Sequence, residues 1–203
     1  MMVTRRQQIW CAIALTVSGA STGYAQAPGS SDPPDKPVFR AQARGVVAAD
    51  FGERVSNYVE LRSRLGRGLP ELSVTDDPGE IRRAQRALAK TIRHARAGAR
   101  QGDIFTPTIS AAFRDVLLVE TSAGTMAAIL DENPGELSRS INRAYPPGKP
   151  RASMPASMLA VLPQLPDDLQ YRFLGRALVL IDTRTNLILD RMPCAIACAA
   201  PSP

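Results

Sequence analysis

The segment LQYRFLGRALVLIDTRTNLILD, residues 169–190, decides the fold class of this chain. Its apolar residues form three short runs that are typical of strands, because they are too brief for helices and turn-forming residues separate them. The strand candidates are 169–174, 178–181 and 187–189. Gly175-Arg176 and the segment 182–186 connect them, and connections this short favour antiparallel neighbours. The sequence therefore predicts a small antiparallel β-meander near the C-terminus.

Upstream of this meander, apolar residues recur at helical spacing. A first helix is predicted over residues 46–65, ended by the glycines and proline that follow it. A second helix begins at Asp77, a favourable N-cap residue, with Pro78 in the first turn. It ends at Gly98 or Gly102, since glycine is the usual residue after a helix. We expect its apolar face, carried by Ile81, Leu88 and Ile92, to hold it to the core.

Two further helices are predicted before the meander. Thr106-Pro107 opens one, which continues after Gly124 as far as Leu130, and a shorter one ends at Ile141. Three strands are not stable alone, so their apolar side must pack against the helices. We therefore expect an α+β fold, with about four helices packed against a small C-terminal antiparallel β-meander. This single globular domain is predicted to span residues 45–193.

Residues 1–27 have the organisation of a signal peptide. Arg5 and Arg6 precede an apolar run at 9–17, and Ala25-Gln26-Ala27 matches a cleavage site. The apolar run is too short to span a bilayer, and no second run of about 18 residues follows. We expect a protein exported to the periplasm or secreted, with no transmembrane anchor after signal cleavage. The alternative is an N-terminal helix that remains attached.

The segments that flank the predicted domain lack a periodic pattern. Residues 28–44 are predicted to be a flexible linker, because proline, glycine and serine dominate their first part. Residues 194–203 are predicted to be an Ala/Cys/Pro tail. The tail holds Cys194 and Cys198, which an oxidising compartment would allow to pair. Their spacing is not the Cys-x-x-Cys of a redox site, so we expect no catalytic role.

Charge and composition argue against a nucleic-acid partner. The 203-residue chain has a formal net charge of +6, and two of its arginines belong to the predicted signal peptide. The mature chain is therefore only mildly basic, which favours solubility without indicating a nucleic acid. Export also separates the protein from DNA and RNA.

Residues suited to metal binding or catalysis are sparse. His94 is the only histidine, and transition-metal sites need clustered His, Cys or carboxylate ligands. We expect His94 to be exposed, and we expect no metal or other cofactor. Asp131-Glu132 and Asp167-Asp168 are pairs of chain neighbours, which rarely face one another across a substrate as glycosidase carboxylates do.

The alternative hypothesis to a non-catalytic binding module is an enzyme. Such an enzyme, of unknown class, would build its site from scattered carboxylates and arginines. Convergence of Asp103, Asn133 and Arg139 in one apolar-walled pocket would favour it. Their dispersal over caps and turns would favour a binding module without catalysis.

The most distinctive surface feature is a row of cations along the second helix. These residues lie about a third of a turn from its apolar face, so both faces can be satisfied. They form a candidate surface for an anionic partner: Arg82, Arg86, Lys90, Arg93, Arg96 and Arg100. A solvated helix face is the simpler interpretation. Phe105 follows this helix closely and marks a candidate binding edge, although a core position between two helices also fits it.

Three sequence blocks resemble a family of exported bacterial proteins of unknown function. The blocks are GARQGDIFTP (98–107), DENPGE (131–136), and the set LPQLP (162–166), YRFLGR (171–176), LVLID (178–182) and LILD (187–190). The resemblance covers roughly residues 45–196 and implies export, with no assigned activity. We therefore predict a non-catalytic binding or envelope-associated module, whose partner is an anionic envelope component or another protein.

Overall fold

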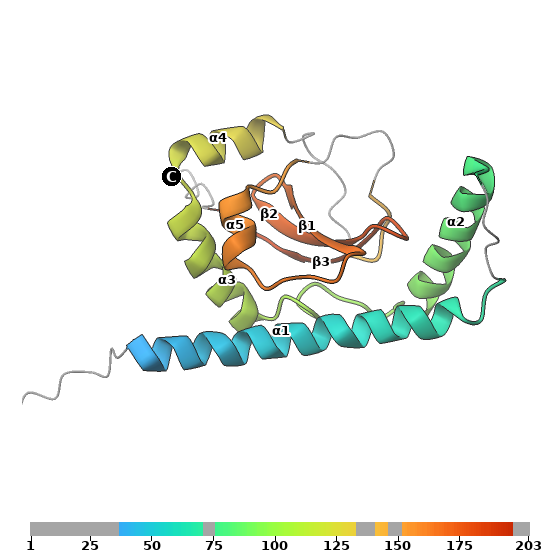
Figure 1. Cartoon of the computed structure of the whole chain (residues 1–203), viewed down its shortest axis with the longest axis horizontal. Coiled ribbons are helices and arrows are strands. Elements are labelled where there is room, and N and C mark those ends of the chain that lie inside the picture. Colours follow the sequence, from blue (N-terminus) through green and yellow to red (C-terminus); the bar gives the residue numbers. More distant parts are fainter. Residues whose placement is uncertain (1–36, 71–75, 133–140, 146–151, 197–203) are drawn as a thin grey trace, which may run out of the picture. The chain divides into compact units, whose positions relative to one another are not determined.

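Three antiparallel strands form one sheet in the computed structural model, which describes residues 37–70, 76–132, 141–145 and 152–196. The strands are β1 (Leu169–Leu174), β2 (Ala177–Asp182) and β3 (Leu187–Met192), and their spatial order is β1-β2-β3 (Figure 1). The predicted meander and the α+β class are confirmed. The described residues belong to one compact unit, residues 36–203. The predicted signal peptide lies outside them.

Five helices precede the sheet in the described part of the chain. They are α1 (Pro37–Gly66), α2 (Pro78–Ala95), α3 (Pro107–Glu120), α4 (Ala123–Asp131) and α5 (Ala156–Val161). None of them combines the length and apolar character that crossing a bilayer requires. α5 was not predicted, because six residues are too few to display helical periodicity. The predicted helix that ends at Ile141 falls mostly outside the described residues.

The start of α1 corrects the predicted linker. We expected residues 28–44 to be flexible, but the helix begins at Pro37. Proline suits the first turn of a helix, because an N–H group at that position has no intrahelical acceptor. The absence of an N–H from proline therefore costs no hydrogen bond. The residues that follow it are rich in alanine and arginine, which favour helix.

Side-chain caps define the starts of α2, α3 and α4. The Asp77 carboxylate accepts a hydrogen bond of 2.7 Å from the N–H of Gly79. Thr106 and Ser122 accept from backbone N–H groups three residues ahead of them. These bonds satisfy donors that have no intrahelical acceptor. The N-cap predicted at Asp77 is confirmed.

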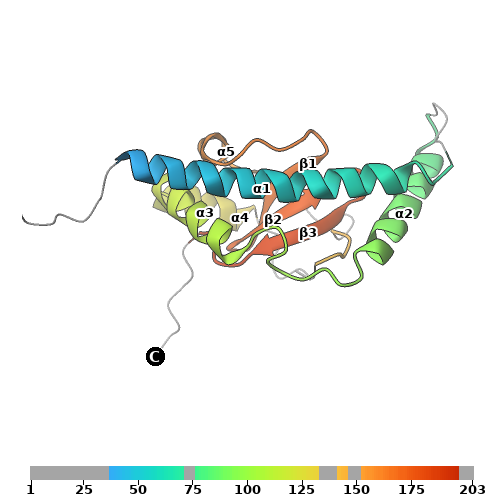
Figure 2. The same ribbon diagram turned by 90° about the horizontal axis from the view of Figure 1, so that it is seen from below.

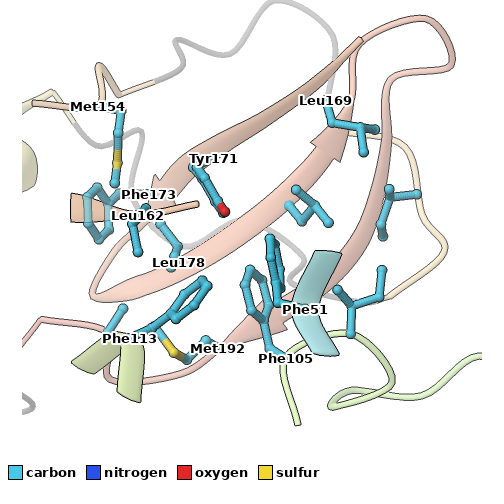
Figure 3. Packing of buried hydrophobic residues seen from close by; sticks show 14 of the residues in the cluster. Phe51, Phe105, Phe113, Met154, Leu162, Leu169, Tyr171, Phe173, Leu178 and Met192 are labelled. Atoms are coloured by element: carbon cyan, nitrogen blue, oxygen red, sulfur yellow. The ribbon is translucent and has the colours of Figure 1, made fainter. Parts of the chain in front are cut away.

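One face of the sheet packs against helices, as predicted. Figure 2 shows α1 running across the strands with α3 beside it. Phe51 on α1 stacks on Phe105 and Tyr171, with ring centroids 5.8 and 6.1 Å apart (Figure 3). Phe113 on α3 lies 5.1 Å from the Phe51 ring. Four aromatic rings, of Phe51, Phe105, Phe113 and Tyr171, thus pack together where α1 and α3 meet the sheet, and Phe105 occupies a core position.

The opposite face of the sheet is also buried. Tyr145, Leu174, Val179 and Ile188 form a second, smaller apolar cluster there with Ile181. Every residue of β2 is consequently buried. We expected only one apolar face, because the period of two is hidden when both faces of a strand are apolar.

The segment 141–145 covers the outer edge of β3. Asn142 N–H donates to the carbonyl of Ile188, and Ile188 N–H donates to the carbonyl of Arg143, at 2.8 and 2.9 Å. Tyr145 N–H donates to the carbonyl of Asn186. This edge therefore has backbone partners that an uncovered edge strand lacks.

The C-terminal boundary of the domain also differs from the prediction. Ala195 and Ile196 are buried in the main core, within the predicted tail 194–203. The Arg114 guanidinium on α3 donates to the carbonyls of Pro193 and Cys194, which holds this segment in place. Cys194 is disulfide-bonded. The apolar pair Ala195-Ile196 is too short to register as a pattern, so the sequence did not reveal its packing.

Candidate functional site

α2 carries the predicted basic surface and is anchored only near its C-terminal end. Its buried residues are Ala89 and Ile92, and Leu88 is half-buried against the core. Ile81 was predicted to lie on the buried face, but it is 39% exposed. The first half of the helix has no buried residue in the described structure. Helical periodicity identifies an apolar side correctly, but not how far along the helix a neighbour covers that side.

Four of the six predicted cations form a continuous exposed face on α2. Arg82, Arg86, Lys90 and Arg93 are all exposed. No salt bridge among the described residues involves them, whereas their neighbour Arg83 lies 3.8 Å from Asp77. Their positive charge is therefore not neutralised within the described part of the chain. This set of four residues is called the basic face below.

Arg96 does not belong to the basic face. Arg96 directly follows the last residue of α2, Ala95, and its N–H still donates to the carbonyl of Ile92, so its side chain lies on the side of the buried Ile92. Its guanidinium donates to the carbonyl of Leu189 at 3.0 Å and lies 5.4 Å from the centre of the Tyr58 ring. Burial lowers the pKa of Arg96. The prediction that all six cations share one helix face is wrong at this position.

Arg100 also lies beyond the end of α2. Its side chain is exposed, but its backbone N–H donates to the Asp103 carboxylate at 2.8 Å within the following loop. Asp103 therefore caps a turn. Asn133 and Arg139, the other residues of the enzyme hypothesis, lie outside the described residues.

The polar end of α2 is fixed to the sheet by Asn142. The side-chain amide of Asn142 donates to the carbonyls of Arg93 and Arg96, at 3.0 and 2.9 Å. These carbonyls lie at the end of the helix, where intrahelical donors are lacking. Because Asn142 belongs to the segment that covers β3, it ties the base of α2 to the sheet. His94, in the same turn, is exposed as predicted.

The loop after α2 is organised by a buried carboxylate that the sequence analysis missed. Asp190 on β3 is fully buried and accepts hydrogen bonds from the N–H groups of Gly102, Ile104, Phe105 and Arg191, at 2.7 to 3.0 Å. Gly102 has a φ of 94°, which glycine tolerates without strain. The carboxylate is thus occupied by backbone donors and serves to hold the loop. The only sequence signal was an aspartate directly after an apolar run.

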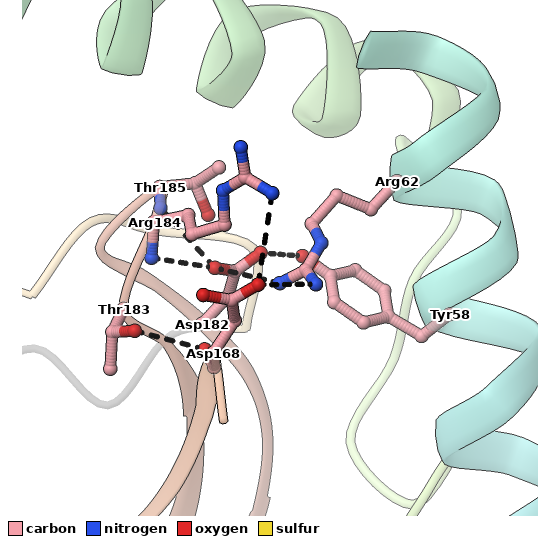
Figure 4. A network of polar contacts seen from close by, with 7 residues as sticks. All are labelled: Tyr58, Arg62, Asp168, Asp182, Thr183, Arg184 and Thr185. Atoms are coloured by element: carbon pink, nitrogen blue, oxygen red, sulfur yellow. Dashed lines mark hydrogen bonds and ion pairs between the residues drawn. The ribbon is translucent and has the colours of Figure 1, made fainter. Parts of the chain in front are cut away.

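A second buried carboxylate joins α1 to the end of β2 (Figure 4). Asp182 accepts a hydrogen bond from the Tyr58 hydroxyl at 2.5 Å and one from the Arg184 N–H at 2.9 Å. The Arg62 guanidinium lies 3.4 Å from Asp182 and donates to Asp168 at 3.0 Å. From the sequence, Asp167-Asp168 was only a pair of chain neighbours unsuited to glycosidase chemistry. Asp167 is exposed, but Asp168 is half-buried and bonded to Arg62.

The interactions of this cluster have a structural role. Burial, and then the charge of Asp182, raise the pKa of Tyr58, so its hydroxyl remains a proton donor. Asp182 accepts from a hydroxyl and from backbone amides, and it is fully buried. The interaction therefore locks α1 onto the sheet. Tyr58 and Arg62 lie four residues apart on one helix face, which is a signal that a search for polar pairs would find.

The other side chains that could act in catalysis or metal binding are dispersed over the described structure. Asp131 and Glu132 are exposed at the end of α4, and Glu132 accepts from the N–H of Ser153. Across the described ranges, no three His, Cys, Asp or Glu side chains gather closely enough to hold a metal ion.

Compared with known proteins, the chain matches no protein-family model, no curated protein and no solved structure. The resemblance to exported bacterial proteins of unknown function therefore stays a prediction.

Proposed function

We propose that this protein is an exported, non-catalytic binding module that contacts an anionic component of the cell envelope through the basic face of α2. The observation that carries the proposal is the exposure of Arg82, Arg86, Lys90 and Arg93 on a helix that is anchored only at its base. Export rests on the signal-peptide pattern of residues 1–27.

The spacing of the basic face suits an extended polyanion or a charged surface. With a rise of about 1.5 Å per residue, the helix places Arg82 and Arg93 about 16 Å apart. Each cation near an anionic surface contributes roughly 1 kcal/mol, so four acting together give a measurable affinity. The contacts would be exposed, so dissolved salt would screen them.

The character of the helix favours contact with head groups over deep insertion. α2 contains no phenylalanine, tyrosine or tryptophan, which anchor helices in the interfacial region. Ile81 is its one exposed large apolar residue. Binding is therefore mainly electrostatic.

The test is co-sedimentation with vesicles of phosphatidylcholine alone or mixed with phosphatidylglycerol, at low and high salt. Wild type should sediment with the anionic vesicles at low salt only, and Arg86→Glu/Arg93→Glu should not sediment. The matched control is Arg44→Glu/Arg64→Glu, which makes the same charge change at exposed positions of α1 and should behave as wild type.

A second arm replaces the vesicles with poly-glutamate, an acidic polymer without a membrane. Binding to the polymer alone would identify the anionic component as a polymer. If wild type binds neither anion at low salt, the proposal is wrong and the basic face is a solvated helix surface.

A further inference from the structure

We propose that the basic face selects a linear polyanion, because such a ligand orders the first half of α2, residues 78–87. The inference rests on the proposed function and adds the chemical form of the ligand. In the free protein this half of the helix is weakly held, and its cations repel one another. A ligand that neutralises several of them at once therefore stabilises the helix as it binds.

Few contacts hold residues 78–87 in the helical conformation. None of their side chains is buried, whereas Ala89 and Ile92 anchor the second half of α2 to the core. Within the described ranges, no hydrogen bond or salt bridge joins residues 78–87 to another helix or strand. A helical segment this short is marginal in water without tertiary packing, so it opens locally more easily than the anchored half.

The cations of the basic face weaken this segment further. Arg82, Arg86 and Lys90 follow one another at intervals of four residues, and like charges at this spacing destabilise a helix. Among the described salt bridges of α2, acidic side chains pair only with Arg83, as Asp77 does at 3.8 Å. An anion that contacts several of the unpaired cations removes the repulsion, and so it favours the helical state.

The geometry of the basic face matches a chain of anions better than a broad surface. With a rise of about 1.5 Å and a turn of about 100° per residue, Arg82, Arg86 and Lys90 lie about 6 Å apart along the axis, and all four cations fall within an arc of about 80°. α2 also has no aromatic side chain to anchor it at a bilayer interface. A monovalent anion neutralises one cation of this narrow stripe at a time, whereas a linear polyanion neutralises neighbours together.

The N-cap of α2 separates ordering of the helix from simple charge attraction. The Asp77 carboxylate accepts from the Gly79 N–H at 2.7 Å and so stabilises the first turn. Its negative charge, however, weakens the attraction of an anion. Removing both the cap and the charge therefore strengthens binding if attraction alone matters, but weakens binding if the helix must be ordered.

The first experiment measures amide hydrogen exchange of the folded protein by NMR, with poly-glutamate or with the same concentration of carboxylate as free glutamate, at equal ionic strength. Poly-glutamate at about ten times its Kd should slow the exchange of residues 83–87 about tenfold, because only the helical state binds it. Free glutamate should leave their exchange unchanged. Residues 113–117 of α3, which pack in the core, are the internal control and should exchange equally in all samples.

The second experiment compares the affinity of two cap variants for poly-glutamate by isothermal titration. Asp77→Asn keeps a side chain that caps well but removes the charge, so it should bind as tightly as wild type or more tightly. Asp77→Ala removes the cap as well, and it should bind up to about fivefold more weakly than Asp77→Asn. Ser122→Ala, which removes the N-cap of α4, is the control for an unrelated cap and should bind as wild type does.

Failure of this inference and failure of the proposed function give different results. If poly-glutamate binds but leaves the exchange of residues 83–87 unchanged, or binds Asp77→Ala as tightly as Asp77→Asn, the inference is overturned and the proposed function stands. Binding of wild type to phosphatidylglycerol vesicles but not to poly-glutamate also overturns the inference alone, because the ligand is then a surface. If wild type binds neither anion, both are wrong.

Discussion

Arginine side chains have different roles in two regions of this molecule. On the outer face of α2, four cations are exposed and have no acidic partner in the described chain. Behind α2 and along α1, Arg62 and Arg96 are drawn inward, where they meet carboxylates, a carbonyl and an aromatic ring. A row of arginines predicted from helical spacing can therefore contain two kinds of residue. Some stabilise the fold through buried contacts, and others are exposed and available to a partner. Stability measurements should separate the two groups.

The largest effect is expected at Asp190. Asp190→Ala would leave the N–H groups of the loop after α2 without their acceptor in a buried place, and each such loss costs about 1–3 kcal/mol. We expect the free energy of unfolding to fall by about 4 kcal/mol in urea melts. Asp131→Ala, at an exposed position, should change it little. Equal costs for both variants would contradict a role for Asp190 in holding the loop.

Arg96→Ala should come next, with a loss of about 2 kcal/mol. The change removes the hydrogen bond to Leu189 and the packing of the guanidinium on Tyr58, at a half-buried site. Urea melts measure the loss. Arg96→Lys should restore only part of it, because an ammonium cannot reproduce the planar contact. If Arg96→Ala has the same free energy of unfolding as wild type, Arg96 does not stabilise the fold and belongs with the exposed cations.

Tyr58→Phe should cost about 1.5 kcal/mol near neutral pH, because Asp182 loses its hydroxyl donor. The cost should depend on pH. The folded state raises the pKa of Tyr58 above its ordinary value near 10, so the unfolded chain releases this proton first as the pH rises. Wild-type stability should therefore fall above pH 10, by up to about 1.4 kcal/mol per pH unit from this tyrosine.

Alkaline urea melts of wild type and Tyr58→Phe test this directly. The variant should lose less stability above pH 10, so the gap between the two proteins should narrow. Tyr171 is also buried with a raised pKa and is present in both proteins, so its contribution cancels. A gap that stays constant from pH 8 to pH 11 would exclude the proposed coupling to Tyr58.

The smallest effect is expected on the basic face. Arg93→Ala should change the free energy of unfolding by no more than about 0.5 kcal/mol, because its side chain is exposed and has no salt bridge in the described chain. The same urea melts as for Arg96→Ala give a direct contrast three residues apart. A loss near 2 kcal/mol for Arg93→Ala would mean that the basic face also serves the fold.

Local patterns predicted the elements well where a strong signal was confined to a few residues. The three strands and the helix starts at Asp77 and Thr106 appear where short apolar runs, turn residues and capping chemistry place them. The start of α1 and the whole of α5 were missed, because one lies in a proline-rich context and the other is too short. The candidate site was predicted in part: four of the six cations lie on the surface of α2, and two lie beyond its end.

The sequence alone was enough for the fold class, the order of the three strands and the amphipathic character of α2, because these depend on spacing between near neighbours. Only the tertiary structure decided which charged residues turn inward. Arg96 meets Leu189 across 93 positions, and Tyr58 meets Asp182 across 124. Such a contact depends on how helices and sheet dock, and the free energy of burying a charge is offset only when the distant partner is in place. No local pattern encodes that partner. The distinction between residues that stabilise the fold through buried contacts and the exposed cations of α2 therefore exists only in the folded chain.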